Sequence, residues 1–191
     1  MRLTPERVRT IPAVSRPAEE PRGDLPPPRK SVTAADVGLL LLRATTGLLL
    51  ACHGAQKLFG LFGGPGLSAA GKGFATLGYH PGEFFAGLAG ASELVGGLGL
   101  AVGLLTPLAA AVVIGDMINA MVVTSQNGLW QTNGGIEYPL SIAVVALAVA
   151  AIGPGRLALD RPFRWRDGGL LSAATALCLG GIGAVIVLAL R

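Results

Sequence analysis

The sequence predicts an all-α membrane protein, a four-helix transmembrane bundle with an additional C-terminal transmembrane helix. Of its 191 residues, 51% are hydrophobic and only 14% are charged, whereas soluble domains are about 25% charged. Five apolar runs each approach the roughly 20 residues with which a helix crosses a bilayer. Glycine is frequent, at 29 residues, as in membrane helices that pack closely through small residues.

The predicted spans follow one another with short connections. Thr33 or Asp36 is expected to cap the start of the first span, and Pro107 suits the first turn of the third. A short interfacial helix is expected within the glycine-rich loop, over residues 67–77. The five spans are expected over residues 37–59, 83–105, 107–125, 136–152 and 170–190.

The chain divides into three parts by composition. Residues 1–35 are rich in proline and arginine and predict a disordered cytoplasmic tail. Residues 36–161 contain the first four spans and predict the membrane domain. Residues 162–191 contain a basic loop and the fifth span, which carries no ionisable residue between Leu170 and Leu190 and is expected to lie outside the core.

Basic residues predict the orientation of the spans. Seven of the 15 Lys and Arg residues lie in the tail, and four more lie between the fourth and fifth spans. Because such residues gather on the cytoplasmic side, we expect a cytoplasmic N-terminus and, after five spans, a C-terminus outside. The net charge of +4 is attributed to these basic residues, which are expected to set the topology and to contact the lipid bilayer. Nucleic-acid binding is not predicted.

Polar side chains inside the spans are the candidate site residues, because a charge in the bilayer core costs about 3 kcal/mol and usually faces a partner. Their expected depths place them in two layers. The inner layer comprises Arg43, Glu93, Asp116 and Asn119. The outer layer comprises His53, Gln56, Lys57 and Glu137.

Each candidate also has a purely structural interpretation. Arg43 is expected to pair with Glu93 or Asp116, and such a pair would either serve only to lock helix packing or take part in ligand binding. Lys57 would extend to the interface without a partner, and His53 would be a buried core histidine. The sequence leaves these alternatives open.

Metal binding is not predicted. One histidine within the spans, with no HxxH or HxxE spacing and no cysteine cluster, supplies too few ligands. Cys52 and Cys178 lie in different spans and are expected to be free packing residues.

Four motifs resemble the DoxX family of small bacterial membrane proteins. Arg43 is followed by the family's G-x-x-K signature, present here as HGAQK (53–57). The second span contains a glutamate followed by glycines, ELVGGLGLAVGLLTP (93–107). The fourth opens with GGIEYPL (134–140) and closes with GPGRLALD (153–160).

The resemblance implies a four-helix, multi-pass protein of the bacterial plasma (inner) membrane. Some relatives are subunits of a thiosulfate:quinone oxidoreductase, and some mycobacterial relatives associate with superoxide dismutase and a sulfurtransferase. Residues 37–161 carry the resemblance, and the tail and fifth span lie outside it.

The leading hypothesis is a quinone-interacting subunit of a membrane redox system, in sulfur or oxidative-stress chemistry, with a soluble or membrane redox partner. Its candidate ligand-binding residues are Arg43, His53, Lys57, Glu93, Asp116, Asn119 and Glu137. Quinone is the candidate cofactor, catalytic residues are not assigned, and an oligomer is left open. The alternatives are a non-catalytic membrane scaffold and a small-solute transporter, so whether the chain is an oxidoreductase subunit stays open.

Overall fold

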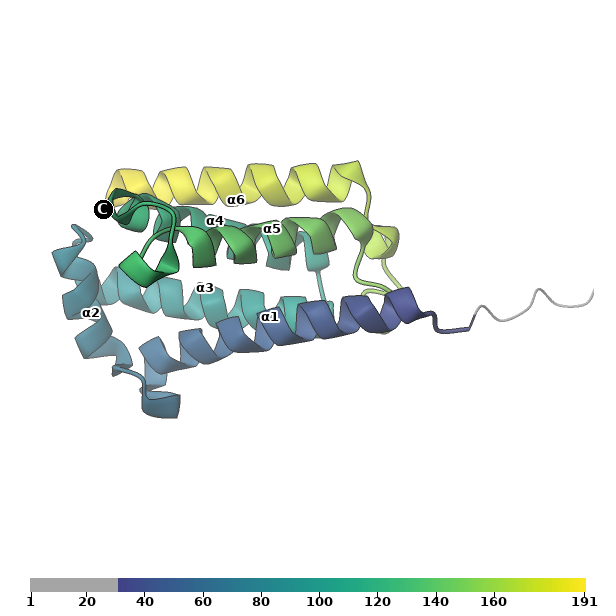
Figure 1. Cartoon of the computed structure of the whole chain (residues 1–191), viewed down its shortest axis with the longest axis horizontal. Helices are drawn as coiled ribbons and strands as arrows, with labels where there is room; N and C mark the ends of the chain where they lie inside the picture. The colour runs from purple at the N-terminus through teal and green to yellow at the C-terminus, as the bar shows by residue number, and fades with distance from the viewer. Residues whose placement is uncertain (1–30) are drawn as a thin grey trace, which may run out of the picture. The chain divides into compact units, whose positions relative to one another are not determined.

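The described part of the chain, residues 31–191, is built from helices and contains no strand (Figure 1). The structure is a computed structural model, and residues 32–191 form one compact unit. The α-helices are α1 (Ala34–Phe59), α2 (Gly66–Thr76), α3 (Gly82–Val102), α4 (Thr106–Thr124), α5 (Glu137–Ile152) and α6 (Leu170–Leu190). Short 3-10 helices are η1 (Leu61–Gly63), η2 (Ser125–Asn127), η3 (Gln131–Asn133) and η4 (Arg164–Asp167).

All five predicted spans are present as helices, which confirms the predicted fold class. The helices α1, α3, α4 and α6 are long and apolar enough to cross a membrane, and α5 is shorter at 16 residues. The predicted interfacial helix at 67–77 corresponds to α2. Most of the predicted tail, 1–35, lies outside the described residues, and α1 already begins at Ala34.

Local sequence explains where the helices begin. Thr33 caps α1 by accepting a hydrogen bond from the Asp36 amide at 3.3 Å, and the Asp36 carboxylate accepts one from the Thr33 amide at 2.9 Å. This reciprocal arrangement satisfies two amides that a helix start leaves unpaired. Pro107 lies in the first turn of α4, as predicted.

The antiparallel helices α1 and α3 approach closely through glycines. Gly47 lies against the backbone of Gly97, and Gly54 lies against the backbone of Gly90, so that a Cβ atom at either position would overlap the opposing chain. Small residues at such crossings let membrane helices pack backbone to backbone. The two contacts fix the register of α1 against α3 and therefore the levels of their polar residues.

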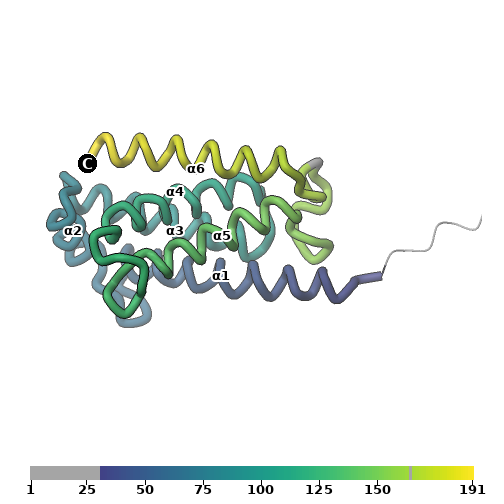
Figure 2. The backbone as a smooth tube through the Cα atoms, turned by 45° about the horizontal axis from the view of Figure 1, so that its top comes forward, coloured from purple at the N-terminus to yellow at the C-terminus, as the bar shows by residue number. Residues whose placement is uncertain are grey.

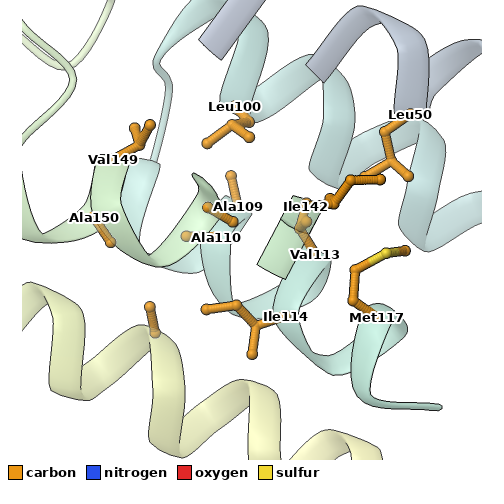
Figure 3. Close-up of a cluster of buried hydrophobic side chains, with 12 residues drawn as sticks. Leu50, Leu100, Ala109, Ala110, Val113, Ile114, Met117, Ile142, Val149 and Ala150 are labelled. Carbon is orange, nitrogen blue, oxygen red and sulfur yellow. The ribbon is translucent and has the colours of Figure 1, made fainter. Parts of the chain in front are cut away.

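Helix α4 is the centre of the bundle and packs against α3, α5 and α6. It supplies five of the twelve buried residues of the apolar core, in which small side chains predominate (Figure 3). Large apolar side chains such as Leu48, Val95 and Val144 instead point outward and are more than half exposed. An apolar exterior of this kind suits a lipid bilayer as the surroundings. The core residues are Leu50, Leu100, Ala109, Ala110, Val113, Ile114, Met117, Ile142, Ala146, Val149, Ala150 and Ala176.

Helix α6 lies along α4 and α5 (Figures 1 and 2). A Cβ atom at Gly180 would lie 2.7 Å from the carbonyl oxygen of Ala111, and one at Gly115 would lie 2.9 Å from that of Gly180. The sequence placed this helix outside the core because it lacks ionisable residues. Small residues pack α6 against α4 instead, and the sequence does not reveal this contact because such residues are uncharged.

The ends of the helices gather at two ends of the bundle (Figure 2). The start of α1 lies at the same end as the segment between α5 and α6. Helix α2, which runs across the other helices, lies at the opposite end together with the C-terminus (Figure 2). There the guanidinium carbon of Arg191 lies 5.8 Å from the centre of the Tyr79 ring.

Candidate functional site

Arg43 is buried at the end of the bundle where α1 begins, with 1% of its surface exposed. Its guanidinium donates hydrogen bonds to the carbonyl of Ala101, in the last turn of α3, and to that of Leu157, at 2.5 Å. The last carbonyls of a helix lack intrahelical partners and carry partial negative charge. Arg43 therefore satisfies a carbonyl at the end of α3 and fixes the segment after α5, which contains Leu157, against it.

Asp160 completes this arrangement from the segment after α5. It is fully buried, and its carboxylate accepts hydrogen bonds from the amides of Leu105 and Thr106, both at 2.7 Å. A carboxylate at a helix start satisfies unpaired amides and interacts favourably with the helix dipole. Asp160 is thus the N-terminal cap of α4, and its negative charge also acts on Arg43.

Asp36 connects the same segment to α1. Its carboxylate accepts a hydrogen bond from the amide of Arg156 at 2.9 Å. Residues 153–160, the GPGRLALD motif, therefore hold α1, α3 and α4 together through Asp36, Arg43 and Asp160. We refer to these three side chains and this segment as the clasp.

The predicted pairing of Arg43 with Glu93 or Asp116 is wrong. Side chains on a helix tilt toward its N-terminus, which directs Arg43 toward the end where α3 finishes. Glu93 belongs to an antiparallel helix, so its side chain tilts the opposite way along the bundle. The two groups therefore diverge, and Arg43 belongs to the clasp rather than to the predicted inner layer.

Lys57 takes the place that the sequence assigned to Arg43, because it forms an ion pair with Glu93. The same tilt explains this pair: Lys57, near the end of α1, extends back along its helix while Glu93 tilts to meet it. The Glu93 side chain is 9% exposed and that of Lys57 is 25% exposed. Lys57 therefore has a partner inside the bundle and does not simply extend to the interface.

A cavity of about 510 Å³ opens beside this pair. Its floor is α4 and its walls are α3 and α6, and residues of α2 and of the segment between α2 and α3 also line it. Most of its lining is apolar, including Leu88, Val112 and Leu179. The polar lining residues are Lys57, Tyr79, Ser92, Glu93, Asp116, Asn119 and Thr124.

Asp116 and Asn119 lie on the floor of the cavity. The Ser92 hydroxyl lies 3.3 Å from the Asp116 carboxylate, and Glu93 and Lys57 are close enough to act on it electrostatically. The Asn119 carbonyl oxygen accepts a hydrogen bond from the Tyr79 hydroxyl at 3.3 Å. Three of the four predicted inner-layer residues therefore meet at the cavity, joined by Lys57 from the predicted outer layer.

The other outer-layer residues do not line this cavity. His53 is exposed, packs edge-on against Tyr138 and lies 3.1 Å from the side-chain oxygen of Gln56. The Glu137 carboxylate accepts a hydrogen bond from the Gln131 amide at 2.9 Å and so holds η3. The helices bring His53, Lys57 and Glu137 to one end of the bundle but not to one site.

Sequence reasoning missed three residues that the structure makes important. Asp160 was visible as the last residue of the GPGRLALD motif, but the sequence does not show that it caps α4. Tyr79 lies in a loop far along the chain from Asn119, and Ser92 is an ordinary small residue in a span. No sequence signal places these two side chains at a cavity.

Neither cysteine lines this cavity. Cys52 is half-buried, Cys178 is exposed on α6, and neither forms a disulfide. Among residues 31–191, no three His, Cys, Asp or Glu side chains gather as metal ligands.

Comparison with known proteins agrees with the architecture. The DoxX family model matches residues 38–126, which contain the ion pair and the floor of the cavity. The chain is 31% identical over 134 residues to an uncharacterized membrane protein of Mycobacterium tuberculosis, and the match covers 64% of this chain and 79% of that protein. No solved structure matches the chain. With its helical membrane architecture and these similarities, the chain belongs to the DoxX family of integral membrane proteins.

Proposed function

We propose that this protein binds a lipid-soluble ligand with a polar head group, such as a quinone, in the cavity between α3, α4 and α6. The carrying observation is the combination of a mostly apolar cavity of about 510 Å³ with the Lys57–Glu93 pair and Asp116 in its lining. Pockets that bind small molecules are commonly about 300–1,000 Å³, mostly apolar, with a few polar groups that orient the ligand.

The residue types around the cavity fit a quinone head group. Its two carbonyl oxygens need hydrogen-bond donors, and Lys57 has three N–H groups of which Glu93 uses one. The Tyr79 hydroxyl, which donates to the Asn119 oxygen at 3.3 Å, would be a second donor on turning to the ligand. A quinone bound there would accept two electrons and two protons, and Glu93 and Asp116 are the carboxyl groups placed to exchange protons with it.

As a subunit of a redox system, the protein would receive electrons from a partner protein. We place it in the bacterial plasma membrane with the N-terminus in the cytoplasm. The basic residues after α5 lie at the end of the bundle where α1 begins, which supports this orientation. Reporter fusions at Lys72 and at Arg191 would both report an outside location, and a cytoplasmic signal from either would contradict the orientation.

A non-catalytic scaffold is the second candidate, and the clasp favours it. Holding the helices together engages most of the polar atoms of Arg43, Asp36 and Asp160, so these side chains leave few hydrogen-bonding groups for a ligand. The Lys57–Glu93 pair alone would also serve as an internal helix contact. This candidate differs from ligand binding in one respect: it requires no small molecule in the cavity.

The test is mass spectrometry of lipids and quinones that copurify with the protein, using two glycine variants of α6. Gly183 lines the cavity and Gly181 does not, and a Cβ atom at either would meet nothing within 4 Å. Gly183→Phe should fill the cavity and remove the ligand, whereas Gly181→Phe should retain it. A ligand retained equally by both variants, or absent from the wild type, would favour the scaffold.

A further inference from the structure

The lining of the cavity changes from polar to apolar along α4. The polar lining residues of this helix, Asp116, Asn119 and Thr124, all lie between its middle and its end. From Gly115 back toward the start of α4, the described lining residues of the helix are all apolar, and the last of them is Leu108. The distance from Leu108 to Asp116 along the helix axis is about 12 Å. The cavity is therefore amphipathic along its length.

The polar side chains of the other elements lie beside those of α4. Ser92 lies 3.3 Å from Asp116, and the ion pair between α1 and α3 is close enough to act on the same carboxyl group. Tyr79, from the segment before α3, lies 3.3 Å from Asn119. The charged and hydrogen-bonding groups of the described lining are thus gathered in one part of the cavity, from the level of Asp116 to the end of α4.

Helix α6 borders the other part of the cavity. A Cβ atom at Gly180 would lie 2.7 Å from the carbonyl oxygen of Ala111, which fixes the level of α6 against α4. The side chains that line this part are all apolar, and we refer to it as the apolar arm. The apolar arm is lined by Leu108, Ala111, Val112, Leu179 and Gly180.

The apolar arm is open to the surroundings of the protein. Leu108, Val112 and Leu179 line it, yet they are 46%, 39% and 46% exposed. The polar part reaches deeper into the bundle, since Tyr79 and Glu93 are 3% and 7% exposed. Because α3, α4 and α6 are long and apolar enough to cross a membrane, an opening along their sides faces hydrocarbon and not water.

We infer that the ligand of this cavity carries a hydrocarbon chain on its head group, and that the apolar arm holds the start of this chain. The inference rests on the proposed function, because it assigns a chain-bearing ligand and its direction to the same cavity. The head group lies beside the charged and hydrogen-bonding side chains. The chain runs along α4 past Val112 and Leu108, where only apolar contacts are offered, and continues into the lipid.

The arm determines the direction of the chain more than the affinity of the ligand. Lipid tails are as apolar as the leucines of the arm, so a chain gains little when it moves from lipid into the arm. The polar part of the cavity therefore supplies most of the binding free energy. A ligand held in this way enters and leaves sideways, and its chain never crosses the polar part.

The test uses two photoreactive probes in vesicles that contain the full-length protein. Both have a naphthoquinone ring and a chain of two isoprene units, and their diazirine lies either beside the ring or at the end of the chain. The ring probe should label lining residues from Asp116 toward the end of α4, and the chain probe should label Leu108, Val112 and Leu179. Leu98 is the matched control, because it is 44% exposed on α3 and does not line the cavity. An excess of the same quinone without a diazirine should remove the labels of the arm and leave those of Leu98.

A pair of variants tests the arm separately from the head group. Val112→Trp should fill the arm and weaken binding of the chain-bearing quinone by roughly tenfold, the scale of an overpacking penalty. It should leave the affinity for dimethylnaphthoquinone, which has no chain, unchanged, and Leu98→Trp should weaken neither quinone. Affinities follow from the shift in melting temperature that each quinone produces with the full-length protein in detergent. If Val112→Trp does not fold, the labels on the wild type decide the question alone.

The outcomes separate this inference from the proposed function. Leu77 and Leu88 are also exposed lining residues, but they lie in the part of the cavity next to α2. Chain labels there would overturn the direction of the chain while keeping the cavity as the binding site. Equal weakening of both quinones by Val112→Trp, or weakening of neither, would also overturn the arm as the site of the chain. Labels that resist competition as those of Leu98 do, with no melting shift from either quinone, would overturn both proposals.

Discussion

Lys57 and Glu93 form an ion pair across the crossing of α1 and α3, although they are 36 positions apart in the chain. The closely packed glycines hold the two helices in register, and the opposite tilts of the two side chains bring the charges together. Asp116 lies beside the pair on α4, so that three helices contribute a charged group to one cavity.

The arrangement predicts unequal effects when either member of the pair is removed. Lys57→Met leaves Glu93 and Asp116 without their cation and should cost roughly 3–5 kcal/mol of unfolding free energy. Glu93→Gln should cost less, because Lys57 can turn to Asp116. Unfolding of purified variants in detergent measures both, and a larger loss from Glu93→Gln than from Lys57→Met would contradict the three-charge arrangement.

Arg43 is predicted to act independently of Glu93. Arg43→Leu should destabilise the fold by about 3–5 kcal/mol, because it leaves Asp160 buried without its nearby cation. Arg43→Lys should restore little, because an ammonium lacks the planar fork that reaches two carbonyls.

Double-mutant cycles check the independence of Arg43. Arg43→Leu combined with Glu93→Gln should be additive within about 0.5 kcal/mol, since the two residues share no partner. Combined with Asp160→Asn, it should show a coupling that exceeds this limit. Strong coupling to Glu93 would restore the pairing that the sequence first suggested.

Asp160 is predicted to be the most sensitive carboxylate of the clasp. Asp160→Ala removes the acceptor of two buried amides at the start of α4 and should cost about 3 kcal/mol or more. The matched control is Asp167→Ala, in the same connection, whose side chain is 82% exposed and whose loss should stay within about 0.5 kcal/mol. Equal losses in an unfolding assay would show that Asp160 is not a structural cap.

Helix α6 is predicted to be required for a stable bundle. Gly180→Val would bring a side chain onto the backbone of α4 and should cost at least about 1–3 kcal/mol. Gly183→Val, three residues away and facing open space, should be tolerated. Melting temperatures of the two variants test this, and a chain truncated near Arg164 that stays folded would contradict it.

The helices could be predicted from the sequence because membrane spans are recognisable as apolar runs of about 20 residues. The last span, 170–190, coincides with α6, and the others differ from the predicted ranges by a few residues at their ends. The role of Thr33 and Asp36 in capping α1 was also visible, because a capping pair depends on local spacing alone.

The grouping of the polar residues could not be predicted. The expected depths follow the position of each Cα atom along its helix, whereas a lysine or arginine side chain extends about one helical turn toward the start of its helix. On antiparallel helices this shift has opposite signs, which removed Arg43 from the predicted inner layer and added Lys57. Tyr79 and Asp160 reach their partners through loops, and loop paths leave little trace in the sequence.

The most direct test of the central claim, that the cavity between α3, α4 and α6 binds a lipid-soluble ligand, is photo-crosslinking in membranes. A menaquinone analogue with a photoreactive diazirine beside its ring would be activated in vesicles that contain the full-length protein, and the labelled residues would be mapped by peptide mass spectrometry. The account predicts labels on cavity-lining residues of α3, α4 and α6, lost in Gly183→Phe and kept in Gly181→Phe. Labels spread over outward-facing residues such as Leu48 and Val144, unchanged in Gly183→Phe, would contradict it.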